Sequence, residues 1–221
     1  MQMILMFENM KPKISIVDYG LCNLYNVSNA LEHIGAEIEI IDKPKEVKIA
    51  KHIILPGVGA FKNGMRGLKL RELIDPLKEH IEKKRPFLGI CLGMQMMMSK
   101  SYEFGEIDGL DIIEGNVVKI PNINSKNKHH KIPHIGWNKI FLSIDGKKNQ
   151  LLKSQDKKSS MYFVHSYKAE CNKDENILAT TSYNDVNIAA VINKDNAYGC
   201  QFHPEKSGKY GLELLKQFIK L

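Results

Sequence analysis

Two short segments carry residues whose types and spacing suit covalent catalysis. The first, Gly89-Ile90-Cys91-Leu92-Gly93, follows an apolar run and precedes residues at helical spacing. A nucleophile between two glycines at a strand-to-helix turn is typical of a nucleophile elbow, where larger flanking side chains would collide with the strand and helix. The helix N-terminus favours a thiolate, and the amide of Leu92 points to where an oxyanion would form. A buried structural cysteine in a tight turn is the alternative for this motif alone.

The second segment, His203-Pro204-Glu205, lies more than a hundred residues later, after an apolar run. Residues i and i+2 of an extended segment point the same way, so Glu205 can accept from one imidazole nitrogen of His203 while the other faces a thiol. A base oriented by a third group is the general means of activating a nucleophile. An exposed histidine in a loop is the alternative here.

A glycine-rich loop provides a third feature. Pro56-Gly57-Val58-Gly59 follows an apolar run, and its glycines allow a backbone amide to turn into a cavity as a second oxyanion donor. As a phosphate-binding loop it is weak, because it lacks the Lys-Ser/Thr pair and the dinucleotide spacing.

Alternating strand and helix patterns predict how these segments are positioned. Apolar runs at residues 14–17, 38–41, 52–55 and 86–90 predict strands, with helices at 24–34 and 68–81 and a methionine-rich helix after Cys91. Shorter strands at 117–120, 161–164, 188–192 and 199–202 follow, then an amphipathic helix through Leu212, Leu215, Phe218 and Ile219. We therefore expect an α/β fold whose central, largely parallel sheet is flanked by helices, with an additional mixed or antiparallel region in the second half.

Composition narrows the class of protein. The 221 residues are 43% hydrophobic and 26% charged, which is typical of a globular chain. The net charge is +7, but the lysines are dispersed without interleaved aromatics, so no nucleic-acid partner is predicted. No apolar run approaches the roughly 18 residues of a membrane span, so no membrane partner is predicted either. The four cysteines lack disulfide or zinc spacing, which favours the reducing cytoplasm.

The first ten residues contain Met1, Met3, Met6 and Met10 and lack the basic start of a secretion signal. This pattern indicates an upstream start codon. We expect residues 1–11 to be an N-terminal extension outside the core, and residues 12–221 to form one domain.

Six segments resemble one family of enzymes: IVDYG, LPGVGAF, GICLGMQ, KIPHIGWN, YFVHSY and QFHPEKSG, which run from Ile16 to Gly208. GICLGMQ with QFHPEKS is specific to class I (triad) glutamine amidotransferases. The remaining segments are similar to the glutaminase subunits of imidazole glycerol phosphate synthases. The resemblance implies hydrolysis of glutamine to glutamate and ammonia without metal or organic cofactor. It also implies a heterodimer with a cyclase that uses the ammonia in histidine biosynthesis.

The resemblance also implies a role for individual residues. Cys91 would be the nucleophile, His203 the base and Glu205 the residue that orients it. The remaining matches concern the oxyanion (Leu92, Gly57, Val58, Gly59), the glutamine substrate (Gln95, Glu103, His165, Ser166, Tyr167) and the face toward the partner (Asn23, Pro133, Trp137, Lys206).

Some residues depart from the family pattern and leave alternatives open. Cys22 stands where the family often has glycine, and 122–130 is a longer polar loop. Similar glutaminases supply amidotransferases of sugar nucleotides in surface-polysaccharide pathways, and residues 162–203 also resemble that branch. A non-catalytic subunit is a third possibility, against which the intact Cys91, His203 and Glu205 argue.

Histidines and methionines near these segments have simpler explanations. His129, His130 and His134 could suggest zinc, but Pro133 prevents a helix there and the PHIGWN segment accounts for His134. Met94, Met96, Met97 and Met98 are expected to fill the core rather than form a binding face.

Overall fold

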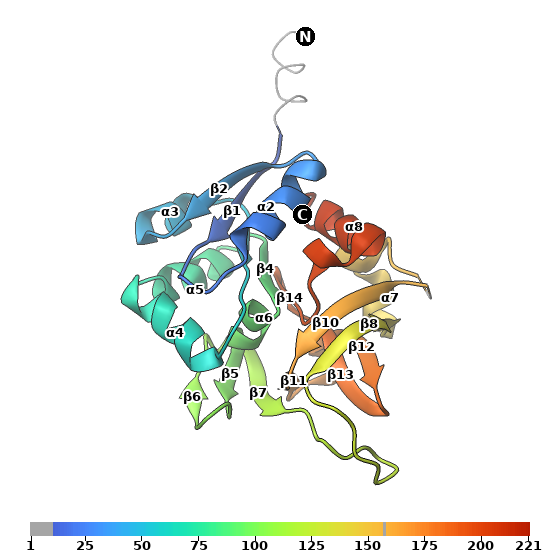
Figure 1. The fold of residues 1–221 in the computed structure, drawn as a ribbon. Helices are drawn as coiled ribbons and strands as arrows, with labels where there is room; N and C mark the ends of the chain where they lie inside the picture. The colour runs from blue at the N-terminus through green and yellow to red at the C-terminus, as the bar shows by residue number, and fades with distance from the viewer. Residues whose placement is uncertain (1–10, 157) are drawn as a thin grey trace.

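The computed structural model describes residues 11–156 and 158–221, and Figure 1 shows their arrangement. The predicted N-terminal extension falls almost wholly on residues 1–10, which lie outside the described residues. Among the described residues, no helix is long and apolar enough to cross a membrane.

An eight-stranded sheet forms the centre of the fold. Its first five strands are parallel and lie in the order β2 (Glu37–Ile41), β1 (Lys13–Val17), β3 (Ile53–Leu55), β4 (Phe87–Ile90) and β14 (Ala197–Cys200). The sheet continues antiparallel through β13 (Val186–Lys194), β12 (Ile177–Tyr183) and β9 (Phe141–Leu142). The predicted largely parallel sheet is confirmed, and the antiparallel strands of the second half extend it.

Two smaller sheets pack on the central one. β10 (Ser160–His165) pairs antiparallel with β8 (His134–Lys139). The other sheet has the order β11 (Tyr167–Cys171), β7 (Ile113–Lys119), β5 (Met98–Ser101) and β6 (Ile107–Asp108), with mixed directions. The predicted mixed region is thus also confirmed.

Helices cover both faces of the central sheet (Figure 1). One face packs against α3 (Pro44–Ile49), α4 (Phe61–Leu70), α5 (Ile74–Glu82), α6 (Leu92–Met96) and the β11-β7-β5-β6 sheet. The other packs against α2 (Leu24–His33), α8 (Gly208–Phe218), the 3-10 turn η1 (Gln150–Leu152) and β10. Alternation along β1 explains the two cores, since Val17 belongs to the first and Ile14 and Ile16 to the second. The remaining short elements are α7 (Ile144–Lys148), η2 (Asp174–Asn176) and η3 (Pro204–Lys206).

Two helix predictions were wrong in their boundaries. The predicted helix at 68–81 is two helices, because the chain turns at Glu72, whose φ is +57°, between α4 and α5. The helix after Cys91 ends at Met96, and Met98 already begins β5. The four predicted core methionines are nevertheless fully buried, so their core role is confirmed. Met94 and Met96 lie in the predicted helix, whereas Met97 and Met98 lie beyond it.

Gly93 marks a close approach of β3 and α6. A Cβ atom on Gly93 would lie 1.8 Å from the Leu55 carbonyl oxygen, a backbone atom that cannot move without shifting the strand. A Cβ on Gly64 would meet only side-chain atoms, the sulfur of Met96 at 2.7 Å and Cδ2 of Leu92 at 3.2 Å, and the methionine side chain is flexible.

These contacts predict unequal costs for the same substitution. Gly93→Ala should lower the free energy of unfolding by about 1–3 kcal/mol or more through overpacking. Gly64→Ala, inside α4, should change it by less than about 1 kcal/mol, because helix propensity offsets the crowding. Denaturant unfolding of both variants measures the difference. Equal stabilities would show that β3 and α6 are not held this closely.

Candidate active site

Cys91 lies on a strained turn between β4 and α6. Its φ is +53° and its ψ −105°, which is unusual for a residue with a side chain, and its amide donates to the Cys200 carbonyl at 2.8 Å. A Cβ on Gly89 would lie 2.7 Å from the backbone of Gly93 and Met94. The predicted need for glycine on both sides of Cys91 is thus confirmed. Within this turn Cys91 is 7% exposed.

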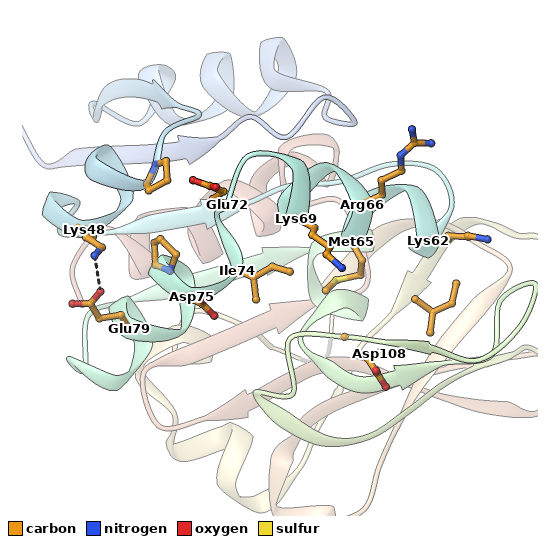
Figure 2. Close-up of a pocket in the computed structure, with 14 residues that line it drawn as sticks. Lys48, Lys62, Met65, Arg66, Lys69, Glu72, Ile74, Asp75, Glu79 and Asp108 are labelled. Carbon is orange, nitrogen blue, oxygen red and sulfur yellow. Dashed lines mark ion pairs between the residues drawn. The ribbon is translucent and has the colours of Figure 1, made fainter.

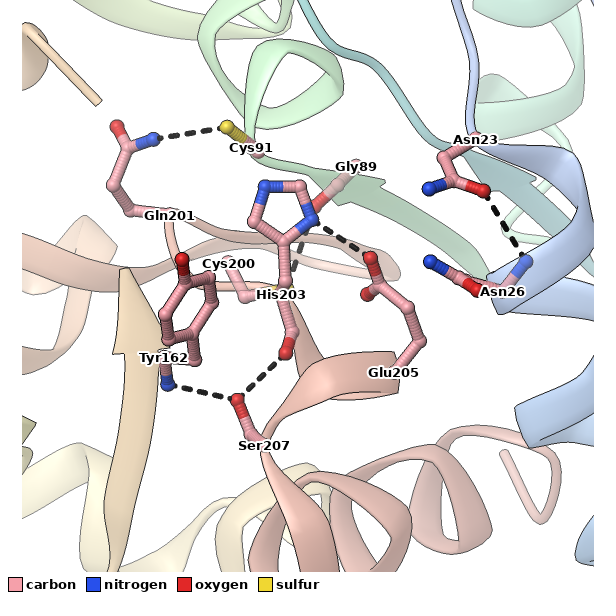
Figure 3. Close-up of polar contacts among 10 residues, drawn as sticks. All are labelled: Asn23, Asn26, Gly89, Cys91, Tyr162, Cys200, Gln201, His203, Glu205 and Ser207. Carbon is pink, nitrogen blue, oxygen red and sulfur yellow. Dashed lines mark hydrogen bonds and ion pairs between the residues drawn. The ribbon is translucent and has the colours of Figure 1, made fainter. Parts of the chain in front are cut away.

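His203 and Glu205 form a buried pair beside this turn. The Nδ1 atom of His203 and Oε1 of Glu205 are 2.7 Å apart, and the two side chains are 4% and 1% exposed. Figure 3 shows the opposite edge of the imidazole turned toward Cys91. Nε2 on that edge is buried and has no hydrogen-bond partner among the described residues. The structure therefore brings Cys91, His203 and Glu205 together. The predicted extended segment was wrong, because Pro204–Lys206 is a 3-10 turn, and it is this turn that returns the Glu205 side chain to the His203 ring.

Opposing effects act on the imidazole of His203. Burial by itself lowers its pKa, because the charged ring loses water. The neighbouring Cys91 and Glu205 side chains outweigh burial and raise the pKa of His203 above its ordinary value. The site therefore favours an imidazolium, which is the form that can protonate a leaving group.

Ser207 supports His203 from behind, a contact that the sequence analysis missed. Its hydroxyl donates to the His203 carbonyl at 2.6 Å and accepts from the Tyr162 amide at 3.0 Å (Figure 3). The His203 amide in turn donates to the Tyr162 carbonyl at 3.0 Å. These bonds fix the segment after β14 to β10.

A cavity of about 280 Å³ opens beside the thiol. It collects most of the residues that the family resemblance assigned to substrate and oxyanion, and its lining is Val58, Gly59, Cys91, Leu92, Gln95, Glu103, Val164, His165, Ser166, Tyr167 and His203. The cavity is at the carboxyl ends of the parallel strands, where α/β sheets usually bind ligands. Its size suits a small amino acid.

Two of the amides predicted to bind the oxyanion, those of Leu92 and of Val58 in the Gly57–Gly59 loop, are bonded to backbone carbonyls in this structure. The Val58 amide donates to the Leu21 carbonyl at 3.0 Å, and the Leu92 amide to the Gly57 carbonyl at 3.4 Å. The loop is tightly packed at Gly57, where a Cβ would lie 2.1 Å from the Tyr19 hydroxyl. Both amides border the cavity, but each would have to exchange its present carbonyl for an oxyanion.

Glu103 has an additional structural contact. Its Oε2 accepts from the Phe61 amide, at 2.6 Å, at the start of α4. A carboxylate at a helix N-terminus is favourable. Glu103 therefore ties the loop between β5 and β6 to the helix that follows the glycine-rich loop.

The residues predicted to face a partner lie outside the cavity. Trp137 on β8 is 57% exposed and contacts Tyr162 edge-on, with ring centroids 6.0 Å apart. Pro133 and Lys206 are exposed, and Asn23 caps α2 by accepting from the Asn26 amide at 3.3 Å. Their role at an interface stays a prediction.

His130, His134 and Cys22 have local partners. The ring of His134 stacks on Phe163 and Tyr183, and His130 contacts Tyr183 edge-on. Cys22 donates its S–H to the Val17 carbonyl at 3.5 Å. Within residues 11–156 and 158–221, no group of three or more His, Cys, Asp or Glu is placed to hold a metal ion.

A second, larger cavity of about 970 Å³ lies between α4, α5 and β6 (Figure 2). Its charged lining is balanced, with the cations Lys48, Lys62, Arg66 and Lys69 and the carboxylates Glu72, Asp75, Glu79 and Asp108. No cysteine, serine or histidine is among its lining residues. The smaller cavity at Cys91 is therefore the candidate active site.

The class of the protein follows from three features: the strained nucleophile turn, the buried His–Glu pair and the α/β sheet. The family model for class-I glutamine amidotransferases matches residues 15–221, and the chain belongs to this family.

Curated relatives are similar over nearly the whole chain. The imidazole glycerol phosphate synthase subunit HisH 1 of Legionella pneumophila (strain Paris) is 46% identical over 210 residues, 94% of this chain and 99% of the relative. The HisH subunit of Caldanaerobacter subterraneus subsp. tengcongensis is 46% identical over 205 residues, 93% of this chain and 96% of the relative.

Solved structures share the fold. PurLQS from Thermotoga maritima matches with a TM-score of 0.69 at 20% identity, over 96% of this chain and 98% of the solved chain. A glutamine amidotransferase from Thermotoga maritima matches with a TM-score of 0.63 at 16% identity, over 96% and 82%. At these identities the likeness concerns the fold alone.

The His203–Glu205 contact predicts a graded loss on substitution. Glu205→Gln should lower kcat/KM for glutamine less than Cys91→Ala or His203→Ala, because the nucleophile and the base both remain. It should also lower the pKa of His203, since one of the two groups that raise it loses its charge. Steady-state kinetics and NMR titration of the imidazole measure both effects. Glu213→Gln, which removes a partly buried carboxylate paired with Lys216 on α8, is the matched control. A folded Glu205→Gln variant as inactive as Cys91→Ala would require a different role for Glu205.

Proposed function

We propose that this chain is the glutaminase subunit of an imidazole glycerol phosphate synthase. It hydrolyses glutamine to glutamate and ammonia and passes the ammonia to a cyclase subunit for histidine biosynthesis. The observation that carries the proposal is the strained Cys91 turn beside the buried His203–Glu205 pair. It occurs in a chain 46% identical, over nearly its full length, to relatives named as this subunit.

The first half of the reaction forms a thioester. The Cys91 thiolate attacks the carbon of the glutamine side-chain carboxamide, and the resulting oxyanion accepts hydrogen bonds from the Leu92 amide and an amide of the Gly57–Gly59 loop. The His203 imidazolium donates a proton to the nitrogen, and ammonia leaves as the C–N bond breaks. Glu205 accepts from Nδ1 of His203 and holds the ring in this orientation.

The second half releases glutamate. Neutral His203 removes a proton from water, the hydroxide attacks the thioester carbon, and the C–S bond breaks to regenerate the thiolate. Gln95, Glu103 and residues 165–167, where β10 passes into β11, line the cavity and would hold the glutamine head group. The scheme uses side chains and backbone amides alone, so no metal or organic cofactor takes part.

The proposal includes a heterodimer in the cytoplasm. Exposed Trp137 and Lys206, with Pro133 and Asn23, would form the face toward the cyclase, and a large aromatic side chain is a suitable anchor there. The four cysteines are free thiols, as a reducing compartment requires. Residues 12–221 would act as a single amidotransferase domain, with the N-terminal extension outside it.

The identity of the nucleophile provides the direct test. A glutamine-like chloroketone should label Cys91 alone, because Cys22, Cys171 and Cys200 lack an elbow and burial raises the pKa of each of these three thiols. Cys91→Ala should abolish ammonia release, and Cys171→Ala should leave it near the wild-type rate. Mass spectrometry of the labelled chain and a glutamate assay measure these outcomes. Activity of Cys91→Ala within tenfold of wild type would refute the mechanism.

The engaged oxyanion amides predict that the partner activates the enzyme. The isolated chain should hydrolyse glutamine slowly, because the Val58 amide is bonded to Leu21 until docking turns it toward the cavity. One oxyanion donor contributes about 10²–10³ in rate, so activation of that order is expected. The measurement is steady-state hydrolysis with and without the cyclase and its ligand.

A matched comparison identifies the partner. A sugar-nucleotide amidotransferase of a surface-polysaccharide pathway should fail to activate the chain, and activation by it in place of the cyclase would assign the chain to that pathway. Full activity of the chain alone, unchanged by either partner, would refute activation by a partner and favour an independent hydrolase.

A further inference from the structure

Gln201 is a fully buried side chain that contacts the thiol and has no part in the mechanism above. It directly follows β14, and its Nε2 donates to the Cys91 sulfur at 3.7 Å (Figure 3). Its Oε1 accepts from Nε2 of Gln95 at 3.1 Å. A donor facing a sulfur stabilises the thiolate more than the thiol, because the acceptor then carries a full charge. Gln201 is therefore placed to act on the reactive form of Cys91.

The orientation of each amide follows from the Tyr167 carbonyl, which can only accept. Gln95 donates to this oxygen at 3.1 Å, so it must present its nitrogen there. Its second N–H then points at Gln201, which must present its oxygen to Gln95 and its nitrogen to Cys91. Both N–H groups of Gln95 are thus committed. Only its Oε1 is left for the cavity, so Gln95 can meet a substrate as an acceptor.

The Tyr167 carbonyl also accepts a hydrogen bond from one buried histidine, His165, which in turn contacts a second, His134. Nδ1 of His165 donates to Tyr167 O at 2.7 Å, and Nε2 of His165 is 3.0 Å from Nδ1 of His134. Nε2 of His134 is 3.1 Å from Oδ1 of Asn138, which follows the exposed Trp137 on β8. A hydrogen-bond chain therefore runs from the Cys91 sulfur to the strand that carries Trp137.

Not every contact in this chain has a proton to share. His165 must donate from Nδ1, so its Nε2 accepts from Nδ1 of His134. Burial lowers the pKa of both rings, to about 3 for His165, so they are neutral and supply two protons for three contacts. The contact without a proton is the outer one, at Asn138. The segment from His134 inward to Cys91 has a donor for every acceptor.

We propose that Gln201 is a positioning residue of the glutaminase reaction, an inference that rests on the proposed function. Its amide N–H holds the Cys91 thiolate in place for attack. Its carbonyl oxygen orients Gln95 as the acceptor for an N–H group of the substrate. The buried His134–His165 pair fixes the position of the Tyr167 carbonyl, and this carbonyl fixes the orientation of the Gln95 amide.

Two substitutions of Gln201 separate its two contacts. Gln201→Glu keeps an acceptor for Gln95 but faces the sulfur with a carboxylate oxygen, whereas Gln201→Met removes both polar groups at similar size. Alkylation of Cys91 by iodoacetamide at neutral pH, followed by mass spectrometry on the full chain, measures the thiolate. It should slow about 10- to 100-fold in both variants, the loss expected for one hydrogen bond to a charged atom.

Kinetics of the complex with the cyclase measure the second contact. KM for glutamine should rise in Gln201→Met, which no longer orients Gln95, and rise less in Gln201→Glu. kcat should fall in both. The other titratable groups near the sulfur are His203, Tyr19 and Cys200, and both variants keep them.

Gln217 on α8 provides the matched control. It is 5% exposed, and its Nε2 donates to the Ser154 hydroxyl at 2.9 Å, away from the site. Gln217→Glu and Gln217→Met lose a buried amide in the same way and should alkylate at the wild-type rate. Folded Gln201 variants with wild-type alkylation and kcat/KM would overturn the proposal.

Two further outcomes keep the test decisive. If neither Gln201 variant folds, the side-chain amide resonance of Gln201 in the wild-type chain should shift when Cys91 is alkylated, and an unshifted resonance would count against the proposal. The other outcome separates the two proposals: the Gln201 variants alkylate slowly, but the wild-type complex does not hydrolyse glutamine. That result would refute the glutaminase function. It would still support the contact between Gln201 and the thiolate.

Discussion

The parallel pairing of β4 with β14 is the interaction on which the candidate active site depends. Ile90 lies opposite Cys200, and the Cys91 amide donates to the Cys200 carbonyl at 2.8 Å. The next residues of both strands therefore emerge at the same edge of the sheet. Cys91 and His203, more than a hundred residues apart in the chain, meet there because parallel strands end together.

Close backbone packing keeps the nucleophile in its strained conformation. A left-handed φ at Cys91 is unfavourable by itself and persists where the surroundings determine it. The determinants are Gly89, packed on the start of α6, and Gly93, packed on the carbonyl of Leu55 in β3. Together with the bond from the Cys91 amide to Cys200 in β14, these contacts hold the strained turn against β3, β4, β14 and α6.

Strand β8 connects the outer surface with the interior of the site. Alternate residues point to opposite faces, so Ile135 and Trp137 are exposed while His134 and the half-buried Asn138 face inward. His134 joins the buried hydrogen-bond chain that reaches Gln95 through the Tyr167 carbonyl. A shift of this strand by a docked partner would therefore distort the buried hydrogen bonds between His134 and Gln95, and such bonds weaken steeply when their geometry is distorted.

The sequence by itself determined the elbow, the nearness of His203 to Glu205 and the parallel half of the sheet, because glycine spacing, short separation in the chain and apolar periodicity are local properties. The extended geometry expected for residues 203–205 was wrong, since Pro204–Lys206 forms a 3-10 turn. It also indicated that the methionines are core residues but not where α6 ends. Only the tertiary structure decided that Gln201 faces the thiol, that Glu103 caps α4 and that the Val58 amide is bonded to Leu21. The partner of a buried polar group is set by the register of segments far apart in the chain. Neither residue type nor spacing encodes that register in a form that can be read locally.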